Sequence, residues 1–201
     1  MPRFNFFTNL GLLPIKDFLD ANQCAALRSE MESQSGYAAT VGSSVDGIID
    51  EDVRRAKWVK VSEQTRALIK ERLIDLKPGL ESHFKIKLDG FEKPQFLIYR
   101  EGCFYTPHRD SSDEPEALEY FRGRKLSVVI FLNDESDEQG QDRYGGGQLT
   151  FYGLMDNPLW KHCGLPLKGE RGLMVAFRSN VMHEVKAVTH GVRLAITTWF
   201  Y

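Results

Sequence analysis

The chain has few cysteines, no long apolar run and almost no net charge, and each shortage argues against a class of protein. Its three cysteines, Cys24, Cys103 and Cys163, form no CxxC pair, which is typical of a reduced, cytoplasmic protein rather than a disulfide scaffold. No apolar stretch approaches the roughly 20 residues that span a bilayer, and the first residues lack the sustained apolar run of a signal peptide. The formal charge of −2 indicates neither a nucleic-acid partner nor a membrane surface.

What is present suits one soluble globular domain over residues 1–201. The 42% hydrophobic and 27% charged residues are ordinary for such a domain, and the length allows a core of its own. The chain contains no internal repeat, and nothing in it specifies an oligomeric state. Its character changes near residue 94: residues 1–94 are expected to supply supporting helices and first strands, and residues 95–201 a β-rich core.

Two amphipathic helices are predicted before that change. Asp20 caps a helix from Ala21 to about Ser33, with Gln23 at the position that completes a capping box. Ser62 caps the second helix, in which Pro78 predicts a kink or a break. Apolar residues recur on one face of this second helix at spacings of three and four, namely Ile69, Leu73, Leu76, Leu80 and Phe84.

The rest of the chain is predicted as short strands and turns. The expected strands are Arg54–Val61, Gln95–Tyr99, Lys125–Leu132, Gln148–Tyr152, Gly172–Phe177, Glu184–Val188 and Val192–Phe200. The expected loops are Ser33–Asp50, Ser111–Gly123 and Asn133–Gly147. The last of these is acidic, and a solvated loop is favoured over a lid. The fold class is therefore mainly β with N-terminal helices (α+β), as a sandwich or barrel.

The most informative motif is His108-Arg109-Asp110, which a distant His183 follows. On a strand, His108 and Asp110 face the same side and Arg109 faces the other. Two imidazoles and one carboxylate suit iron(II), manganese or zinc, with one face of the metal left open. An HxD pair alone is commonly a hydrogen-bonded surface pair, so the distal histidine matters. The remaining histidines, weaker candidates near a helix end or turns, are His83, His162 and His190.

An arginine ten positions after His183 extends the pattern. Arg193 alternates to the same face as Thr197 on the last predicted strand, where a guanidinium meets a carboxylate with two parallel hydrogen bonds. Tyr99 and Tyr105 flank the turn before His108 and are candidates to contact the same acid. The alternatives are an exposed arginine paired with an acid and tyrosines that pack in the core.

Together these segments resemble the iron(II)- and 2-oxoglutarate-dependent oxygenases, in particular their prolyl 4-hydroxylase-like branch. The matching segments, about half the chain, are residues 99–110, 126–133, 145–149, 182–185 and 193–200. The resemblance implies a double-stranded β-helix, or jelly roll, with N-terminal helices against its larger sheet. It implies iron(II) on His108, Asp110 and His183. It further implies 2-oxoglutarate held through its far carboxylate by Arg193, dioxygen as a co-substrate, and ascorbate as an optional addition.

One position departs from this pattern. Where some relatives carry a tyrosine that helps to hold 2-oxoglutarate, this chain has Phe131, so Thr197 or Tyr99 is expected to take over that contact. The intact Asp110 argues against the halogenating relatives, which lack this carboxylate.

The resemblance implies hydroxylation of a C–H bond, with a prolyl residue of a protein or peptide as the leading substrate. A free amino acid or small metabolite is the first alternative, and a cupin-like metal protein that does not use 2-oxoglutarate is the second. A further group of residues either lines an entrance for an acidic substrate or is solvated surface charge, and the second interpretation is favoured. Its members are Arg54, Arg55, Trp58, Arg122 and Arg124.

Overall fold

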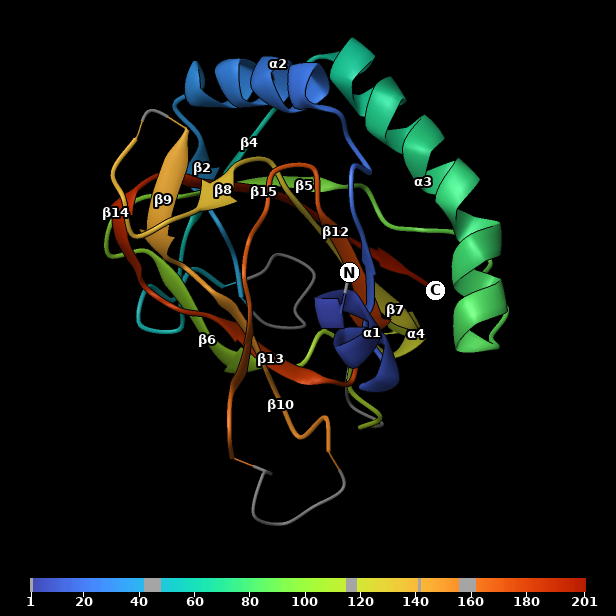
Figure 1. The fold of residues 1–201 in the computed structure, drawn as a ribbon. Coiled ribbons are helices and arrows are strands. Elements are labelled where there is room, and N and C mark those ends of the chain that lie inside the picture. The colour runs from blue at the N-terminus through green and yellow to red at the C-terminus, as the bar shows by residue number, and fades with distance from the viewer. Residues whose placement is uncertain (1, 42–47, 115–118, 141, 156–161) are drawn as a thin grey trace.

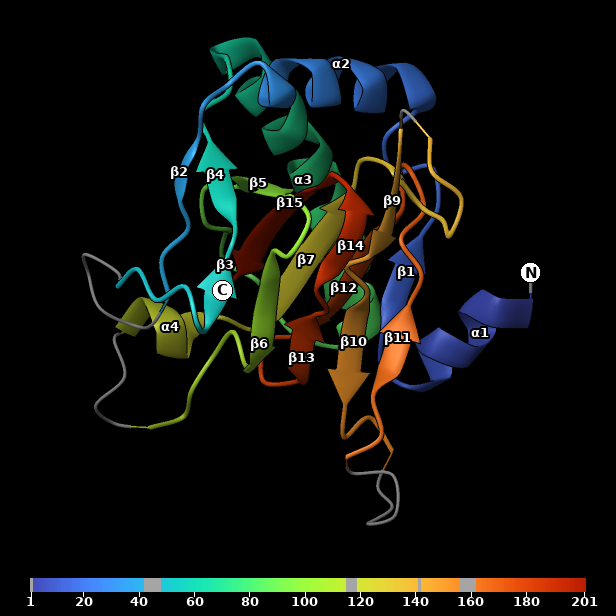
Figure 2. The ribbon, with the colours of Figure 1, turned by 90° about the vertical axis from the view of Figure 1, so that its left-hand side faces the viewer.

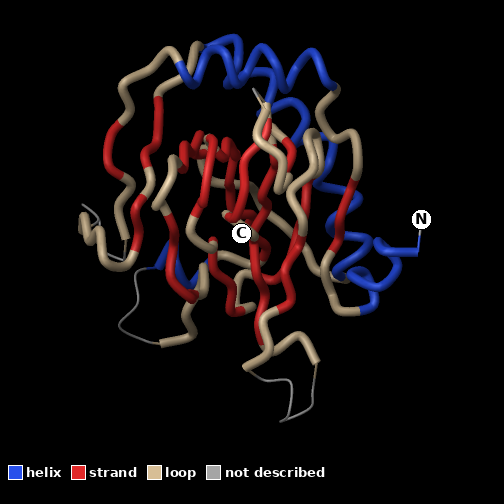
Figure 3. The backbone as a smooth tube through the Cα atoms, turned by 60° about the vertical axis from the view of Figure 1, so that its left-hand side comes forward, coloured by secondary structure: helices blue, strands red, loops and turns tan. Residues whose placement is uncertain are grey.

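Two antiparallel sheets face each other, and two long helices cover the outer face of the larger one. The computed structural model describes residues 2–41, 48–114, 119–140, 142–155 and 162–201. Figure 1 shows the helices α2 and α3 along one side of the strands, and Figure 2 shows the smaller sheet from its own side. Figure 3 shows the strands gathered beneath these helices. This arrangement is a double-stranded β-helix, and the predicted fold class is confirmed.

The helices are α1 (Pro2–Asn9), α2 (Ala21–Glu32), α3 (Glu63–Phe84) and α4 (Glu119–Gly123). The strands are β1 (Leu13–Ile15), β2 (Tyr37–Ala38), β3 (Arg54–Arg55), β4 (Lys57–Val59), β5 (Gln95–Tyr99), β6 (Phe104–His108), β7 (Leu126–Phe131), β8 (Asp134–Glu135), β9 (Arg143–Gly146), β10 (Leu149–Tyr152), β11 (Leu165–Leu167), β12 (Met174–Arg178), β13 (Met182–Val185), β14 (Val188–Gly191) and β15 (Arg193–Phe200). The larger sheet has the order β1-β12-β7-β15-β5-β4-β2, and the smaller has the order β11-β10-β13-β6-β3. A third sheet has the order β14-β9-β8. None of the described helices is long and apolar enough to cross a membrane.

The centre of the larger sheet is buried on both faces, which explains its continuous apolar run. In β7, Val128 and Ile130 pack in the outer core under the helices, whereas Val129 and Phe131 pack in the inner core between the sheets. The same alternation in β15 turns Ala195 inward, and Arg193 and Thr197 share that side because strand side chains alternate with a period of two. The larger sheet thus presents one polar row to the interior.

Both predicted helices are present. The capping box of α2 is complete: the Gln23 N–H donates to Asp20 Oδ1 at 2.8 Å, and the Asp20 N–H donates to Gln23 Oε1 at 3.0 Å. Of the kink or break expected at Pro78, the break does not occur, since α3 continues to Phe84. Pro78 removes only the N–H that would bond to the carbonyl of Ile74. Because Ile74 is exposed, water can bond to that carbonyl instead.

Where the predicted strands differ from the structure, tertiary pairing is the cause. The expected strand Arg54–Val61 is two strands: β3 pairs with β6 in the smaller sheet, and β4 pairs with β5 in the larger. The expected strand Glu184–Val188 likewise divides, because β13 pairs with β6 whereas β14 pairs with β9. Each division occurs where the chain passes from one sheet to another.

The predicted loops hold more structure than expected. Ser33–Asp50 contains β2, Ser111–Gly123 contains α4, and Asn133–Gly147 contains β8 and β9. Residues 42–47 and 115–118 of the first two lie outside the described residues. These elements were missed because segments of two to five residues carry too little periodicity to be recognised.

Candidate active site

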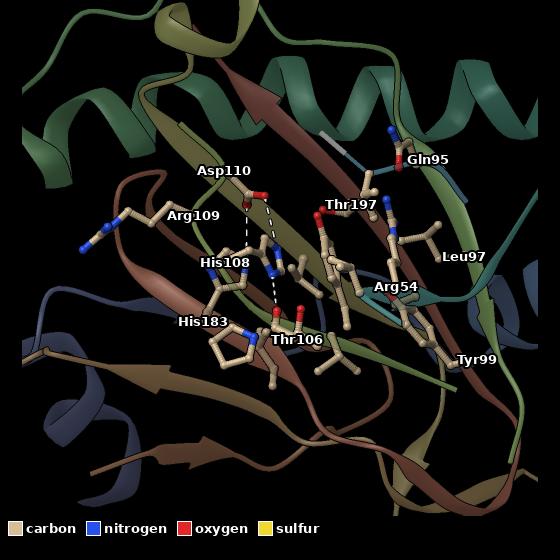
Figure 4. A pocket seen from close by; sticks show the side chains of 18 of the residues that line it. Arg54, Gln95, Leu97, Tyr99, Thr106, His108, Arg109, Asp110, His183 and Thr197 are labelled. Carbon is tan, nitrogen blue, oxygen red and sulfur yellow. Dashed lines mark hydrogen bonds and ion pairs between the residues drawn. The ribbon is translucent and has the colours of Figure 1, made fainter. Parts of the chain in front are cut away.

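Three side chains that could hold a metal ion converge between the two sheets. His108 ends β6, Asp110 follows two residues later, and His183 lies in β13 directly opposite His108 in the strand register. One ligand atom from each of the three lies within 4.8 Å of the others. Asp110 is already past the strand end, where its N–H donates to the carbonyl of Ser179 at 2.9 Å. Figure 4 shows Arg109 pointing away from this cluster, as the alternation predicts.

Both histidines are oriented in the same way. Nδ1 of His108 lies 2.8 Å from the carbonyl oxygen of Thr106, and Nδ1 of His183 lies 2.9 Å from that of Val181. A carbonyl oxygen only accepts, so each Nδ1 carries the hydrogen and each Nε2 keeps a free lone pair. The Nε2 atoms lie 3.6 Å (His108) and 3.4 Å (His183) from the carboxylate oxygens of Asp110. The donor set therefore fits a divalent metal ion.

The carboxylate of Asp110 is held ionised. Burial by itself raises the pKa of Asp110, but His183, His108 and the hydroxyl of Ser127 together outweigh burial and hold this pKa well below its usual range. Ser127 Oγ, from β7 of the larger sheet, donates to Asp110 Oδ2 at 2.7 Å. A partner of this kind orients a metal-ligating carboxylate.

His183 is held neutral. Burial lowers the pKa of His183 to about 4, although the charge of Asp110 acts in the opposite direction. A neutral imidazole is the form that binds metal ions. The neutral nitrogen of His183 and the anionic oxygen of Asp110 therefore lie together with Nε2 of His108 as three possible metal ligands.

A cavity of about 380 Å³ opens beside this cluster, and Arg193 lines it from the larger sheet. Arg193 is 2% exposed, and its Cζ lies 5.1 Å from the ring centroids of both Tyr99 and Phe131. Its Nε has no hydrogen-bond partner, and among the described residues Arg193 forms no ion pair. A buried guanidinium without a counter-charge is costly. The arrangement is therefore suited to an acid that enters the cavity.

The other predicted contacts also line this cavity, in different roles. Tyr99 pairs with Arg193 across the strands. Thr197 donates its hydroxyl hydrogen to the carbonyl of Val128 at 3.2 Å, so towards the cavity its oxygen acts only as an acceptor. Tyr105 stacks on His108, with ring centroids 3.5 Å apart and planes 16° apart. Burial raises the pKa of Tyr105 to about 12, which keeps its phenol protonated.

The prediction of solvated charge is wrong for two arginines. Arg54 is 7% exposed and lines the cavity. Arg124 also lines it, pairs with Glu92 through Nε at 2.5 Å and Nη2 at 2.8 Å, and donates from Nη1 to the backbone carbonyl of Asp110 at 3.2 Å. Arg55 and Arg122 are exposed, as expected.

Several residues of the site carry no signal in the sequence. Ser127 lies within an apolar strand, and Trp199, whose ring lies 3.8 Å from Cζ of Arg124, resembles any core aromatic. Only the packing of β7 and β15 in the folded protein shows that Ser127 and Trp199 belong to the site.

Several known proteins are similar to this chain in sequence or in fold. A sequence model of the 2OG-Fe(II) oxygenase superfamily matches residues 94–201, which is the part expected to form the jelly roll. A PKHD-type hydroxylase of Maricaulis maris is 30% identical over 152 residues, 72% of this chain and 60% of that protein. A PKHD-type hydroxylase of Cupriavidus metallidurans is 26% identical over 94% of this chain and 77% of that protein. The chain thus spans less than two thirds of the first of these relatives.

Solved structures support the fold. A prolyl-4-hydroxylase of Pseudomonas putida superposes with a TM-score of 0.67 at 24% identity, covering 94% of this chain and 91% of that one. A prolyl hydroxylase of Trichoplax adhaerens, in complex with a hypoxia inducible factor peptide fragment, superposes with a TM-score of 0.68 at 21% identity, covering 100% and 91%.

Proposed function

Because this chain belongs to the 2OG-Fe(II) oxygenase superfamily, we propose that it is an iron(II)- and 2-oxoglutarate-dependent dioxygenase that hydroxylates a C–H bond. The leading substrate is a prolyl residue of a protein or peptide. One observation carries the proposal: a His-Asp-His cluster and a buried arginine without a counter-charge line the same cavity.

In this proposal His108 Nε2, His183 Nε2 and an oxygen of Asp110 hold the iron. Bound iron(II) would supply the activation of dioxygen, coupled to the oxidative decarboxylation of 2-oxoglutarate to succinate and carbon dioxide. The carbonyls of Thr106 and Val181 fix both imidazoles. The ligand atoms therefore need little rearrangement when the ion enters.

Arg193 would hold the far carboxylate of 2-oxoglutarate, because its guanidinium lines the cavity and has no counter-charge, and its Nε has no hydrogen-bond partner, among the described residues. The rings of Tyr99 and Phe131 flank the guanidinium and exclude water from it, which strengthens a charge-assisted pair. Phe131 adds no hydrogen bond. We therefore assign Tyr99, and to a lesser degree Thr197 and Tyr105, to the remaining contacts with the acid.

The substrate assignment draws on the relatives. The solved prolyl hydroxylases and the PKHD-type hydroxylases favour a peptidyl proline, and a free amino acid or small metabolite is the alternative. A cupin-like protein that does not use 2-oxoglutarate is disfavoured, since it would leave the charge of Arg193 unmatched. A cytoplasmic location, ascorbate as an optional addition and a single domain over residues 1–201 remain predictions.

The test is an anaerobic titration. Iron(II) followed by 2-oxoglutarate should produce a visible charge-transfer band in the wild-type protein, and oxygen with a substrate should then produce succinate. Asp110→Ala should show neither signal, because two neutral imidazoles alone bind iron weakly. Asp113→Ala, which removes an exposed acid three residues further on, should retain both. Full turnover by Asp110→Ala would refute the proposal.

A further inference from the structure

Arg54 is a second buried cation in the cavity. It lies in β3 at the edge of the smaller sheet, where it pairs with Tyr105 of β6. Its Cζ sits 4.8 Å from the centroid of the Tyr105 ring, and Tyr105 stacks on His108. Arg54 is therefore only one aromatic ring removed from a metal-ligating imidazole. In Figure 4 its side chain lies across the pocket from Asp110.

Arg54 has no counter-charge among the residues that the structure describes. Nη1 donates to the carbonyl of Thr40 at 2.9 Å, and the buried Nε has no hydrogen-bond partner. Two other arginines with little side-chain exposure differ: Arg28 pairs with Asp142 at 2.8 Å, and Arg124 pairs with Glu92. Arg54 thus shares with Arg193 the one feature that indicates an anionic ligand.

When the charges of a site with iron(II) and 2-oxoglutarate bound are added up, the charge of Arg54 is not balanced. Iron(II) is balanced by Asp110 and one carboxylate of 2-oxoglutarate, and the second carboxylate balances Arg193. The pair of Arg124 with Glu92 is neutral, and an imidazole that binds a metal ion adds no charge of its own. Among the charges that the described residues supply, one positive charge therefore remains, on Arg54, which is only 7% exposed, and an unmatched buried charge is costly.

We propose that Arg54 binds a carboxylate of the substrate and thereby selects substrates with an acidic group close to the reacting carbon. The inference rests on the proposed function and narrows its substrate class. A planar guanidinium matches a carboxylate with two hydrogen bonds. Arg54 lines the cavity, and with Nη1 on Thr40 its Nε still lacks a hydrogen-bond partner among the described residues. The carboxylate has two chemical sources: the acid's own carboxylate in a free proline-like amino acid, or an aspartate beside the reacting proline of a peptide.

Matched probes distinguish these sources. L-proline is compared with L-prolinamide, and blocked peptides with aspartate on either side of a proline are compared with their asparagine counterparts. For each probe, the perturbation of the iron–2-oxoglutarate band gives a dissociation constant, and succinate formation gives substrate stimulation. We expect the acidic member of one pair to bind about 10- to 100-fold more tightly than its neutral counterpart, as for a charge-assisted pair.

Variants then assign this preference to Arg54. Arg54→Gln should abolish the preference, because it weakens the binding of the acidic probe and leaves that of the neutral probe unchanged. Arg54→Lys should retain part of the preference. Both variants should keep the 2-oxoglutarate band of the wild type. Arg55→Gln is the control, because Arg55 is the exposed neighbour in the same strand. If Arg54→Gln also loses the iron–2-oxoglutarate band, its site is misfolded. The result for Arg54→Lys then decides whether the preference for the acidic probe depends on Arg54.

Several outcomes would overturn the inference. They are equal binding of both members of every pair, a preference that survives in Arg54→Gln, and the absence of binding by any acidic probe. Each is separate from a failure of the proposed function, which would show as a missing iron–2-oxoglutarate band in the wild-type protein.

Discussion

Replacing Arg193 should have opposite effects on two quantities. Its buried charge should lower the stability of the protein without ligand, and the same charge should raise the affinity for 2-oxoglutarate. Arg193→Met keeps much of the side-chain volume and removes the charge. Burial of an unpaired ion costs several kcal/mol after relaxation. The two ring contacts at 5.1 Å offset this by about 0.5–2 kcal/mol each. We therefore expect the free energy of unfolding of the metal-free protein to stay unchanged or to rise by about 1 kcal/mol.

Binding of 2-oxoglutarate should respond in the other direction. Truncation of one partner of a buried charge pair costs about 2–5 kcal/mol, so the dissociation constant should rise about 30-fold to several thousand-fold. Urea unfolding with a chelator measures the first quantity, and anaerobic titration of the visible band measures the second.

A surface arginine is the matched control. Arg143→Met removes a guanidinium that pairs with Glu138 at 2.8 Å on the surface, so it should change stability by less than about 1 kcal/mol and leave acid binding unchanged. If Arg193→Met destabilises the metal-free protein by about 2 kcal/mol or more, or binds the acid with wild-type affinity, then Arg193 is a structural residue and the reasoning is wrong.

Two further predictions follow from the same site. Gly147→Ala places a Cβ 3.0 Å from Cδ of Arg193 at a φ of +61°, so it should weaken the binding of 2-oxoglutarate. The control Gly153→Ala introduces the same left-handed backbone strain (φ +67°) but has no atom within 4 Å of the new Cβ, so it should weaken binding less. Equal effects of the two variants in a titration would contradict this prediction. The metal-free protein should lose stability as the pH falls from 6.5 towards 4, since His183, with its pKa lowered to about 4, binds its proton more readily when unfolded. The expected loss of stability is on the order of 3 kcal/mol. Asp110, whose pKa is lowered, loses its contribution to stability only when the pH falls below the usual pKa of an aspartate. If the stability measured by urea unfolding does not change with pH over this range, His183 is not buried in its neutral form.

Local patterns in the sequence were enough for the long elements and for the chemistry of the site. The capping box at Asp20 and the apolar face of α3 depend on contacts within a few residues, so both helices were predicted. Residue types are equally local: two imidazoles, a carboxylate and a guanidinium indicated a metal and an acid before any geometry was known.

Only the tertiary structure decided which charges are buried and which residues meet. Arg54 and Arg55 are identical neighbours in the sequence, yet strand pairing buries Arg54 over Tyr105 and leaves Arg55 exposed. Ser127 contacts Asp110 only because β7 begins beside the loop that follows β6. Burial and long-range register are properties of the packed sheets, and no local pattern encodes them.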